Sequence, residues 1–116
     1  MIEYVSFGVQ WYEGFGSGWT ELPTLLSGQT GGHYIDQDGV MLTGLSGYHS
    51  GSGTELKVYV NDRLLTWIGT SQLQSMGRFS PMAVPLDVGD RIRVYGYMHD
   101  LHEYVGCVIQ LRSRRE

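Results

Sequence analysis

The segment Gly96–Tyr104, with the sequence GYMHDLHEY, holds the densest group of side chains that could do chemistry. It contains two histidines, His99 and His102, and two acids, Asp100 and Glu103. Imidazoles and carboxylates are common zinc ligands, and they also serve as general acids and bases. Histidines three residues apart could converge on one face of a helix, but on a strand they point to opposite faces. The choice between a metal enzyme and a polar loop therefore depends on the element that carries this segment.

The spacing of these side chains argues against a metal site. Jelly-roll enzymes of the cupin type place metal-binding histidines in an H-x-H pattern along a strand, and they add a glutamate and a distant third histidine. Here the pattern is H-x-x-H-E, which breaks the alternation of a strand. The possible distant ligands His33 and His49 lie among glycines in expected loops. We therefore expect a polar loop with no metal, no cofactor and no catalytic residue, although His99, His102 and Glu103 are the candidates if a metal binds.

Aromatic side chains are the other candidates for binding. The chain has three tryptophans and eight tyrosines, and exposed aromatic rings can anchor a protein interface or stack on sugars. Near the C-terminus, the outward positions of the strand patterns hold tyrosines and a valine, which is more apolar than a lone soluble protein needs. We therefore predict a protein interface that includes Trp19, Tyr95, Tyr97, Tyr104 and Val108.

A second use of the aromatic side chains stays open. A lectin-like or receptor-binding module would hold a glycan with aromatic and acidic side chains from its loops. That interpretation predicts one exposed cleft formed by Trp19, His33, Tyr34 and Asp36.

The composition indicates which elements position these residues. In 116 residues there are 17 glycines and eight tyrosines, but a single alanine and a single lysine. Good helix formers are therefore scarce, whereas tyrosine favours strands and glycine favours tight turns. A chain of this length forms one domain with one core. We predict a single domain over residues 1–116, in which residues 1–20 form an N-terminal strand or arm.

Alternation of apolar and polar residues predicts the strands. In YVSFGVQW, for example, Val5 and Phe7 share one face and Ser6 lies on the other. A short strand is also expected around Leu25, at a sheet edge because Pro23 removes a hydrogen-bond donor. The result is an all-β fold, an antiparallel two-sheet β-sandwich that is jelly-roll-like and has about eight strands. The longer expected strands lie at residues 4–11, 39–48, 54–60, 63–69, 78–86, 91–97 and 104–112.

Charge and hydropathy exclude several classes of function. The formal net charge is −4 and the one basic cluster, LRSRRE, is terminal, so no surface suited to nucleic acid is expected. No apolar run approaches the ~20 residues that span a bilayer, and the N-terminus shows no secretory signal. The single cysteine, Cys107, lies in an apolar strand pattern and is expected to be a buried thiol.

Four segments follow one another in an informative order: DGVMLTGLSGY, ELKVYVND, AVPLDVGDRIRV and EYVGCVIQL. Their order resembles the tumour-necrosis-factor and complement globular-head superfamily of jelly rolls. The resemblance covers Asp38–Leu111; Asp62 and Val105 depart from it, because the family usually has a glycine and an aromatic residue there. The residues that match the family pattern are Gly39, Val58, Val60, Asn61, Leu86, Gly89, Asp90, Ile92, Val94 and Gly106.

The resemblance implies a fold, and small freestanding jelly rolls of this kind resemble the cement or decoration proteins of bacteriophage capsids. We therefore expect a non-enzymatic structural protein of a virion, made in the host cytoplasm, that forms a dimer or trimer and braces a major capsid protein. Two alternatives stay open: the carbohydrate- or receptor-binding module described above, and a cupin-like metal enzyme centred on His99, His102 and Glu103. Neither nucleic acid nor a membrane is an expected partner.

Overall fold

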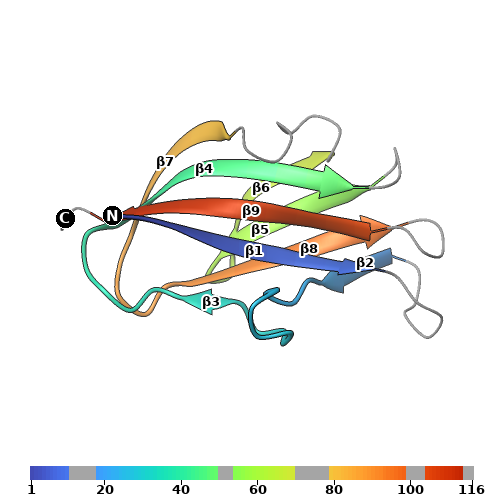
Figure 1. Ribbon diagram of the computed structural model, residues 1–116, viewed down its shortest axis with the longest axis horizontal. Coiled ribbons are helices and arrows are strands. Elements are labelled where there is room, and N and C mark those ends of the chain that lie inside the picture. Colours follow the sequence, from blue (N-terminus) through green and yellow to red (C-terminus); the bar gives the residue numbers. More distant parts are fainter. Residues whose placement is uncertain (11–17, 50–53, 70–78, 99–103, 114–116) are drawn as a thin grey trace.

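The computed structural model describes residues 1–10, 18–49, 54–69, 79–98 and 104–113, which form nine antiparallel strands in two sheets (Figure 1). Sheet A has the strand order β1 (Ile2–Gln10), β9 (Tyr104–Ser113), β4 (Val40–His49) and β7 (Ser80–Leu86). Sheet B has the order β2 (Gly18–Glu21), β8 (Arg91–Met98), β5 (Glu55–Val60) and β6 (Arg63–Gly69). The remaining strand, β3 (His33–Tyr34), also pairs with β8. The predicted all-β sandwich is confirmed.

The connections give the sandwich its jelly-roll-like character. The chain passes from one sheet to the other at most connections, whereas β5 and β6 form a hairpin within sheet B. The first and last strands, β1 and β9, lie side by side along their whole length. Two layers with the strand orders β1-β9-β4-β7 and β2-β8-β5-β6, joined in this way, form the arrangement of a jelly roll. The described residues contain no helix that is long and apolar enough to cross a membrane.

The region between β1 and β4 differs from the prediction. A single short strand was expected around Leu25, but Leu25 lies in a turn, and two short strands, β2 and β3, stand on either side of it. Thr24 makes only an isolated bridge to Phe7. Backbone bonds from Gly28 to Thr24 and from Thr24 to Gln29 close the turn, and these divert the chain from a continued ladder. This is why the structure has nine strands where about eight were expected.

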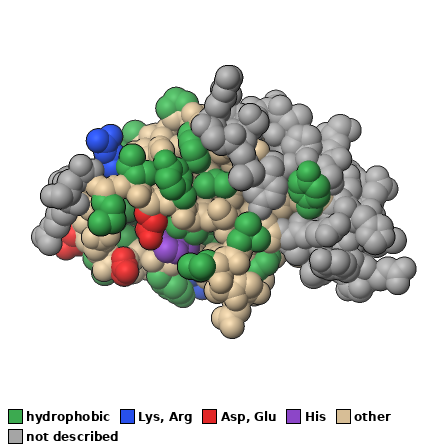
Figure 2. Space-filling model, in the orientation of Figure 1, with side chains coloured by type: hydrophobic (Ala, Val, Ile, Leu, Met, Phe, Trp, Pro, Cys, Tyr) green, Lys and Arg blue, Asp and Glu red, His purple; other side chains and the backbone are tan. Residues whose placement is uncertain are grey.

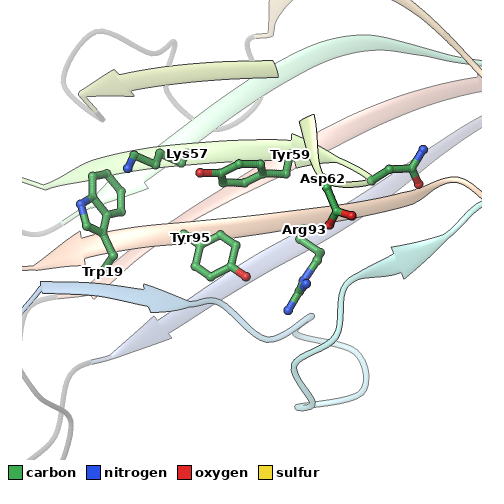
Figure 3. Close-up of a pocket in the computed structure, with 7 residues that line it drawn as sticks. Trp19, Lys57, Tyr59, Asp62, Arg93 and Tyr95 are labelled. Atoms are coloured by element: carbon green, nitrogen blue, oxygen red, sulfur yellow. The ribbon is translucent and has the colours of Figure 1, made fainter. Parts of the chain in front are cut away.

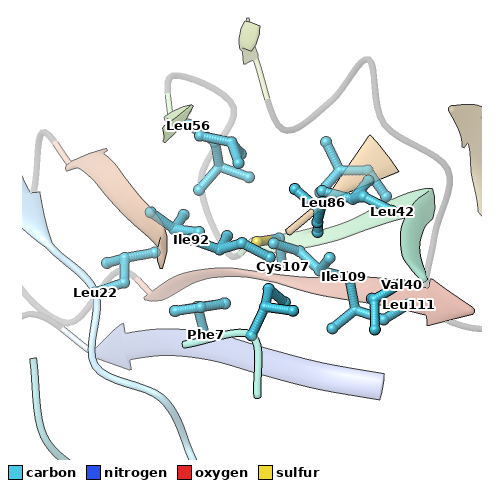
Figure 4. Packing of buried hydrophobic residues seen from close by; sticks show 14 of the residues in the cluster. Phe7, Leu22, Val40, Leu42, Leu56, Leu86, Ile92, Cys107, Ile109 and Leu111 are labelled. Carbon is cyan, nitrogen blue, oxygen red and sulfur yellow. The ribbon is translucent and has the colours of Figure 1, made fainter. Parts of the chain in front are cut away.

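The core lies between the sheets and is built from the inward residues of each strand (Figure 4). Phe7, Leu56, Ile92 and Ile109 are all fully buried, as their positions in the alternating patterns predict. The Cys107 thiol is fully buried among them, and desolvation raises its pKa to about 12. The expectation of a buried thiol is confirmed.

Candidate binding site on the outer face of sheet B

The outward residues of sheet B bring aromatic side chains from four strands together. Alternate residues of β2, β5, β6 and β8 point away from the core, so the pairing register places outward residues in rows. Trp19 pairs with Tyr97, and Lys57 lies between Trp67 on one side and Tyr95 on the other. We call this surface the aromatic face; its aromatic residues are Trp19, Tyr59, Trp67, Tyr95 and Tyr97.

The single lysine of the chain is held between two tryptophans. The Lys57 Nζ atom lies 4.3 Å from the centre of the Trp19 ring and 4.2 Å from that of Trp67. The two indoles meet edge to face, with centroids 5.7 Å apart and an interplanar angle of 80°. A cation over an indole face is attracted by the ring quadrupole. The cluster is thus ordered, yet 56% of Trp67 and 36% of Trp19 are exposed.

The tyrosines extend this order along the sheet. The Trp19 and Tyr97 rings meet at a centroid distance of 5.4 Å, and Tyr59 and Tyr95 meet at 5.5 Å, both edge to face. The Arg93 guanidinium lies over the Tyr95 ring, 5.7 Å from its centre. Edge-to-face packing is favourable and directional, so these contacts restrict the rotamers of the rings. The aromatic face is therefore a fixed surface rather than a set of independent side chains.

Charged side chains border the rings. Arg93 forms a two-pronged ion pair with Glu21, with Nη2 2.8 Å from Oε1 and Nε 3.2 Å from Oε2. The backbone N–H of Gly31 also donates to Glu21 Oε2, at 2.8 Å. The hydrogen bond from Arg93 is the main reason that the pKa of Glu21 lies below its usual value, and the same bond raises the pKa of Arg93. On the other side, Trp67 Nε1 donates to Glu55 Oε1 at 2.9 Å.

A shallow cavity of about 280 Å³ opens on the aromatic face (Figure 3). Figure 3 shows Tyr59 and Tyr95 between Trp19 and Lys57 at one end and Asp62 and Arg93 at the other. The cavity thus combines ring surfaces for stacking with both signs of charge for hydrogen bonding. Its chemistry suits binding of a flat or apolar group that carries polar edges. The residues that line it are Trp19, Lys57, Tyr59, Asn61, Asp62, Arg93 and Tyr95.

The structure divides the predicted interface between two opposite faces. Trp19, Tyr95 and Tyr97 belong to the aromatic face, whereas Tyr104 and Val108 are on the outer face of sheet A, because β8 and β9 belong to different sheets. Tyr104 is exposed, but only 8% of Val108 is exposed, so its expected exposure to solvent is wrong. The strand β9 lies between β1 and β4, and such a central position covers a small side chain from both sides.

The four residues of the predicted glycan cleft do not meet. Trp19 pairs with Tyr97 near one end of β8, whereas His33 pairs with Ile92 near the other. Five residues of strand separate these positions, which is roughly 17 Å. His33 and Tyr34 line a different cavity, beside β1. The expectation of one cleft is therefore wrong, because β2 and β3 pair with opposite ends of the same strand.

The predicted metal candidates His99, His102 and Glu103 lie outside the described residues, so the expectation of a polar loop stays a prediction. Within the part of the chain that is described, no group of three or more His, Cys, Asp or Glu side chains could hold a metal ion.

Several members of the site could not be assigned from the sequence. Lys57 and Tyr59 do lie outward, as the alternation in TELKVYV indicates. However, alternation within one strand does not show that Trp67 lies beside Lys57, or that Glu21 reaches Arg93 from a strand 72 residues earlier. The hairpin between β5 and β6 was the available signal for the first of these contacts.

No family model matches the chain, and comparisons with curated proteins and with solved structures found no similar protein. The geometry of the aromatic face is therefore the basis for the functional argument.

Proposed function

We propose that the chain is a non-enzymatic interaction protein that docks onto other protein subunits through the aromatic face. One observation carries the proposal: Trp19, Lys57 and Trp67 form a packed cluster, with the Lys57 ammonium over both indole rings, that nevertheless faces solvent. Tryptophan, tyrosine and arginine are the residues that contribute most to binding energy in protein interfaces. Because ring contacts already restrict these side chains, docking onto a partner costs little additional side-chain entropy.

The charges of this face favour a second copy of the chain as the partner. The rings are bordered by the cations Lys57 and Arg93 and by the acids Glu21, Glu55 and Asp62. In a two-fold dimer the same surface occurs on both subunits, so a cation of one can meet an acid of the other. We therefore propose that the chain forms a dimer through this face.

We further propose that the assembled protein braces a larger protein shell, as the decoration proteins of bacteriophage capsids do. The jelly-roll-like fold and an ordered docking face support this proposal at the level of analogy. The position of the gene tests it: we expect the gene beside those for other virion proteins. A chromosomal position among metabolic genes, with no viral genes nearby, would contradict this part of the proposal.

The oligomeric state tests the docking surface itself. We expect sedimentation velocity to give a dimer mass that dissociates on dilution, and Trp67→Ala to shift the equilibrium to the monomer. The matched control is Tyr104→Ala, which removes an exposed aromatic side chain from the opposite sheet and should leave the dimer intact. A wild-type monomer at every concentration, or equal effects of the two substitutions, would contradict dimerisation through the aromatic face.

The cavity beside Tyr95 supports a second candidate function, the binding of a glycan. Aromatic rings there could stack on the apolar face of a sugar, and the Asp62 carboxylate could accept hydrogen bonds from its hydroxyl groups. Tryptophan fluorescence during titration with neutral oligosaccharides tests this candidate, because Trp19 lines the cavity. A saturable change that is lost in Asp62→Asn would support it, and an unchanged spectrum at millimolar sugar would contradict it.

A further inference from the structure

A different surface lies along the free edge of sheet A. Among the strands that the structure describes, β1 has a neighbouring strand, β9, on one side only. Part of the other side is used by the chain itself: Gly8 N donates to Pro23 O at 3.1 Å, and Leu25 N donates to Ser6 O at 2.9 Å. A short segment of the chain thus runs antiparallel to β1 near Phe7 and bonds to its edge.

The remainder of this edge points its backbone groups toward the same side. In an antiparallel ladder, successive residues direct their N–H and C=O groups alternately to the two neighbours. Since Gly8 and Ser6 bond away from β9, Tyr4 and Ile2 also direct their groups away from β9. The chain turns back after Leu25, and among the described strands none pairs with this side of β1 before Ser6. The hydrogen bonds between β1 and the segment Pro23–Leu25 therefore end at Ser6, and Tyr4 would be the next residue of β1 to pair on this side.

A groove of about 640 Å³ lies beside this stretch of edge. The strand β1 contributes Glu3 and Tyr4 to its lining, the turn after β2 contributes Leu25 and Leu26, and β3 contributes Tyr34. In Figure 1 the strand β3 lies below β1, and Figure 2 shows hydrophobic side chains exposed on this face of the molecule. Leu26 is fully exposed, and Leu25 and Tyr34 are each more than half exposed. Apolar side chains beside backbone groups that pair with no described strand are the combination that strand addition uses.

We propose that this groove binds an extended, basic segment of a partner protein, which adds to sheet A as a strand antiparallel to β1. Backbone bonds to Ile2 and Tyr4 continue the ladder that Leu25 begins, and apolar residues of the segment pack beside Leu25 and Tyr34. Glu3 selects the charge, because a lysine or arginine directly opposite it on the added strand is favourable. The same side chain disfavours a second copy, since antiparallel pairing of two β1 edges about Glu3 would set the two Glu3 carboxylates opposite each other.

A defined peptide tests this proposal. The probe is an acetylated and amidated peptide of alternating valine and lysine, titrated into the isotopically labelled full chain and followed by NMR. We expect slower exchange of the Ile2 and Tyr4 amide protons, and shifts at residues that line the groove. Methylation of the valine nitrogens, which face Tyr4 in the added strand, should abolish binding, whereas methylation of the lysine nitrogens should preserve it. Equal binding of the two methylated peptides, or no shift at millimolar peptide, would overturn the proposal.

A charge exchange tests the role of Glu3. In Glu3→Lys we expect the valine–lysine peptide to bind about fivefold more weakly and a valine–glutamate peptide to bind more tightly. The variant Trp67→Ala, which alters the distant aromatic face, should bind the peptide as the wild type does, so failure of the proposed dimer leaves this test intact. Shifts confined to the aromatic face, or slow exchange at Tyr4 that depends on protein concentration without peptide, would contradict a basic strand as the occupant.

Discussion

The side chains of Asn61 and Asp90 are joined by a hydrogen bond of 3.1 Å between Nδ2 and Oδ1, and this bond ties the turn between β5 and β6 to the turn between β7 and β8. Asn61 Oδ1 also accepts from the backbone N–H of Arg91 at 3.0 Å, and Asp90 Oδ2 accepts from that of Asp87 at 2.8 Å. Asn61 has a φ of 56°, a conformation that asparagine tolerates better than most residues. These bonds fix the end of β5, and therefore the position of Tyr59 on the aromatic face.

We expect Asn61→Ala to lower the free energy of unfolding by about 2 kcal/mol. The substitution removes two hydrogen bonds, and it places alanine at a positive φ that asparagine tolerates better. Asn61→Gly loses the same bonds but avoids the backbone strain, and should therefore be less destabilising. Urea denaturation of the two variants measures the difference. Equal stability of Asn61→Ala and the wild type would show that the bonds between the turns contribute nothing.

Stability should decline in acid because two carboxylates have lowered pKa values in the folded chain. The Arg93 hydrogen bond lowers the pKa of Glu21 from 4.5, and the Asp87 N–H lowers that of Asp90 from 3.8. A group with a lower pKa in the folded state contributes stability above its unfolded pKa and loses it as pH falls through the folded value. We expect the melting temperature to fall below about pH 4.5, and Glu21→Gln to flatten the fall. An equally steep fall in that variant would exclude Glu21 as a cause.

Gly96 lies where the two sheets approach each other closely. A Cβ atom at this position would lie 2.7 Å from Val105 Cγ1 and 3.1 Å from a methyl group of Leu22, both fully buried. We expect Gly96→Ala to destabilise the fold by about 1–3 kcal/mol through overpacking. Adding Val105→Ala should recover part of the loss, because it removes the clashing methyl groups. Purely additive effects in chemical denaturation would contradict a steric contact between these positions.

The Cys107 thiol should be unreactive in the native protein. It is fully buried, and its pKa of about 12 leaves almost no thiolate at pH 8. We expect an aromatic disulfide reagent to label Cys107 only after denaturation, at a rate set by unfolding. Rapid labelling in buffer would show that the core between β9 and sheet B opens readily.

The sequence predicts the faces of individual strands better than the neighbours of each strand. Alternation correctly places Val58, Ile92 and Ile109 in the core, because a half-buried strand must bury every second side chain. It places Tyr95 and Tyr104 outward as well, and both are outward. That they face opposite sides of the molecule depends on the sheet to which each strand belongs, and alternation within a strand carries no such information.

The aromatic face shows the same limit. Trp19 lies against Tyr97, which is far along the chain, because a strand of four residues pairs with β8. A strand this short has too few residues for a periodic pattern, so its place is set by the packing of the whole sandwich. The composition pointed to exposed aromatic side chains, but only the fold shows which of them lie together.

Acylation of Lys57 tests the central claim, docking through the aromatic face, most directly. Lys57 is the only lysine, so it and the Met1 amino group are the two amines of the chain, and Met1 serves as an internal control. We predict that raising the protein concentration through the dimer range slows acetylation of Lys57 severalfold relative to Met1, as read by mass spectrometry. A dimer in which Lys57 reacts as fast as in the dilute monomer would contradict the claim.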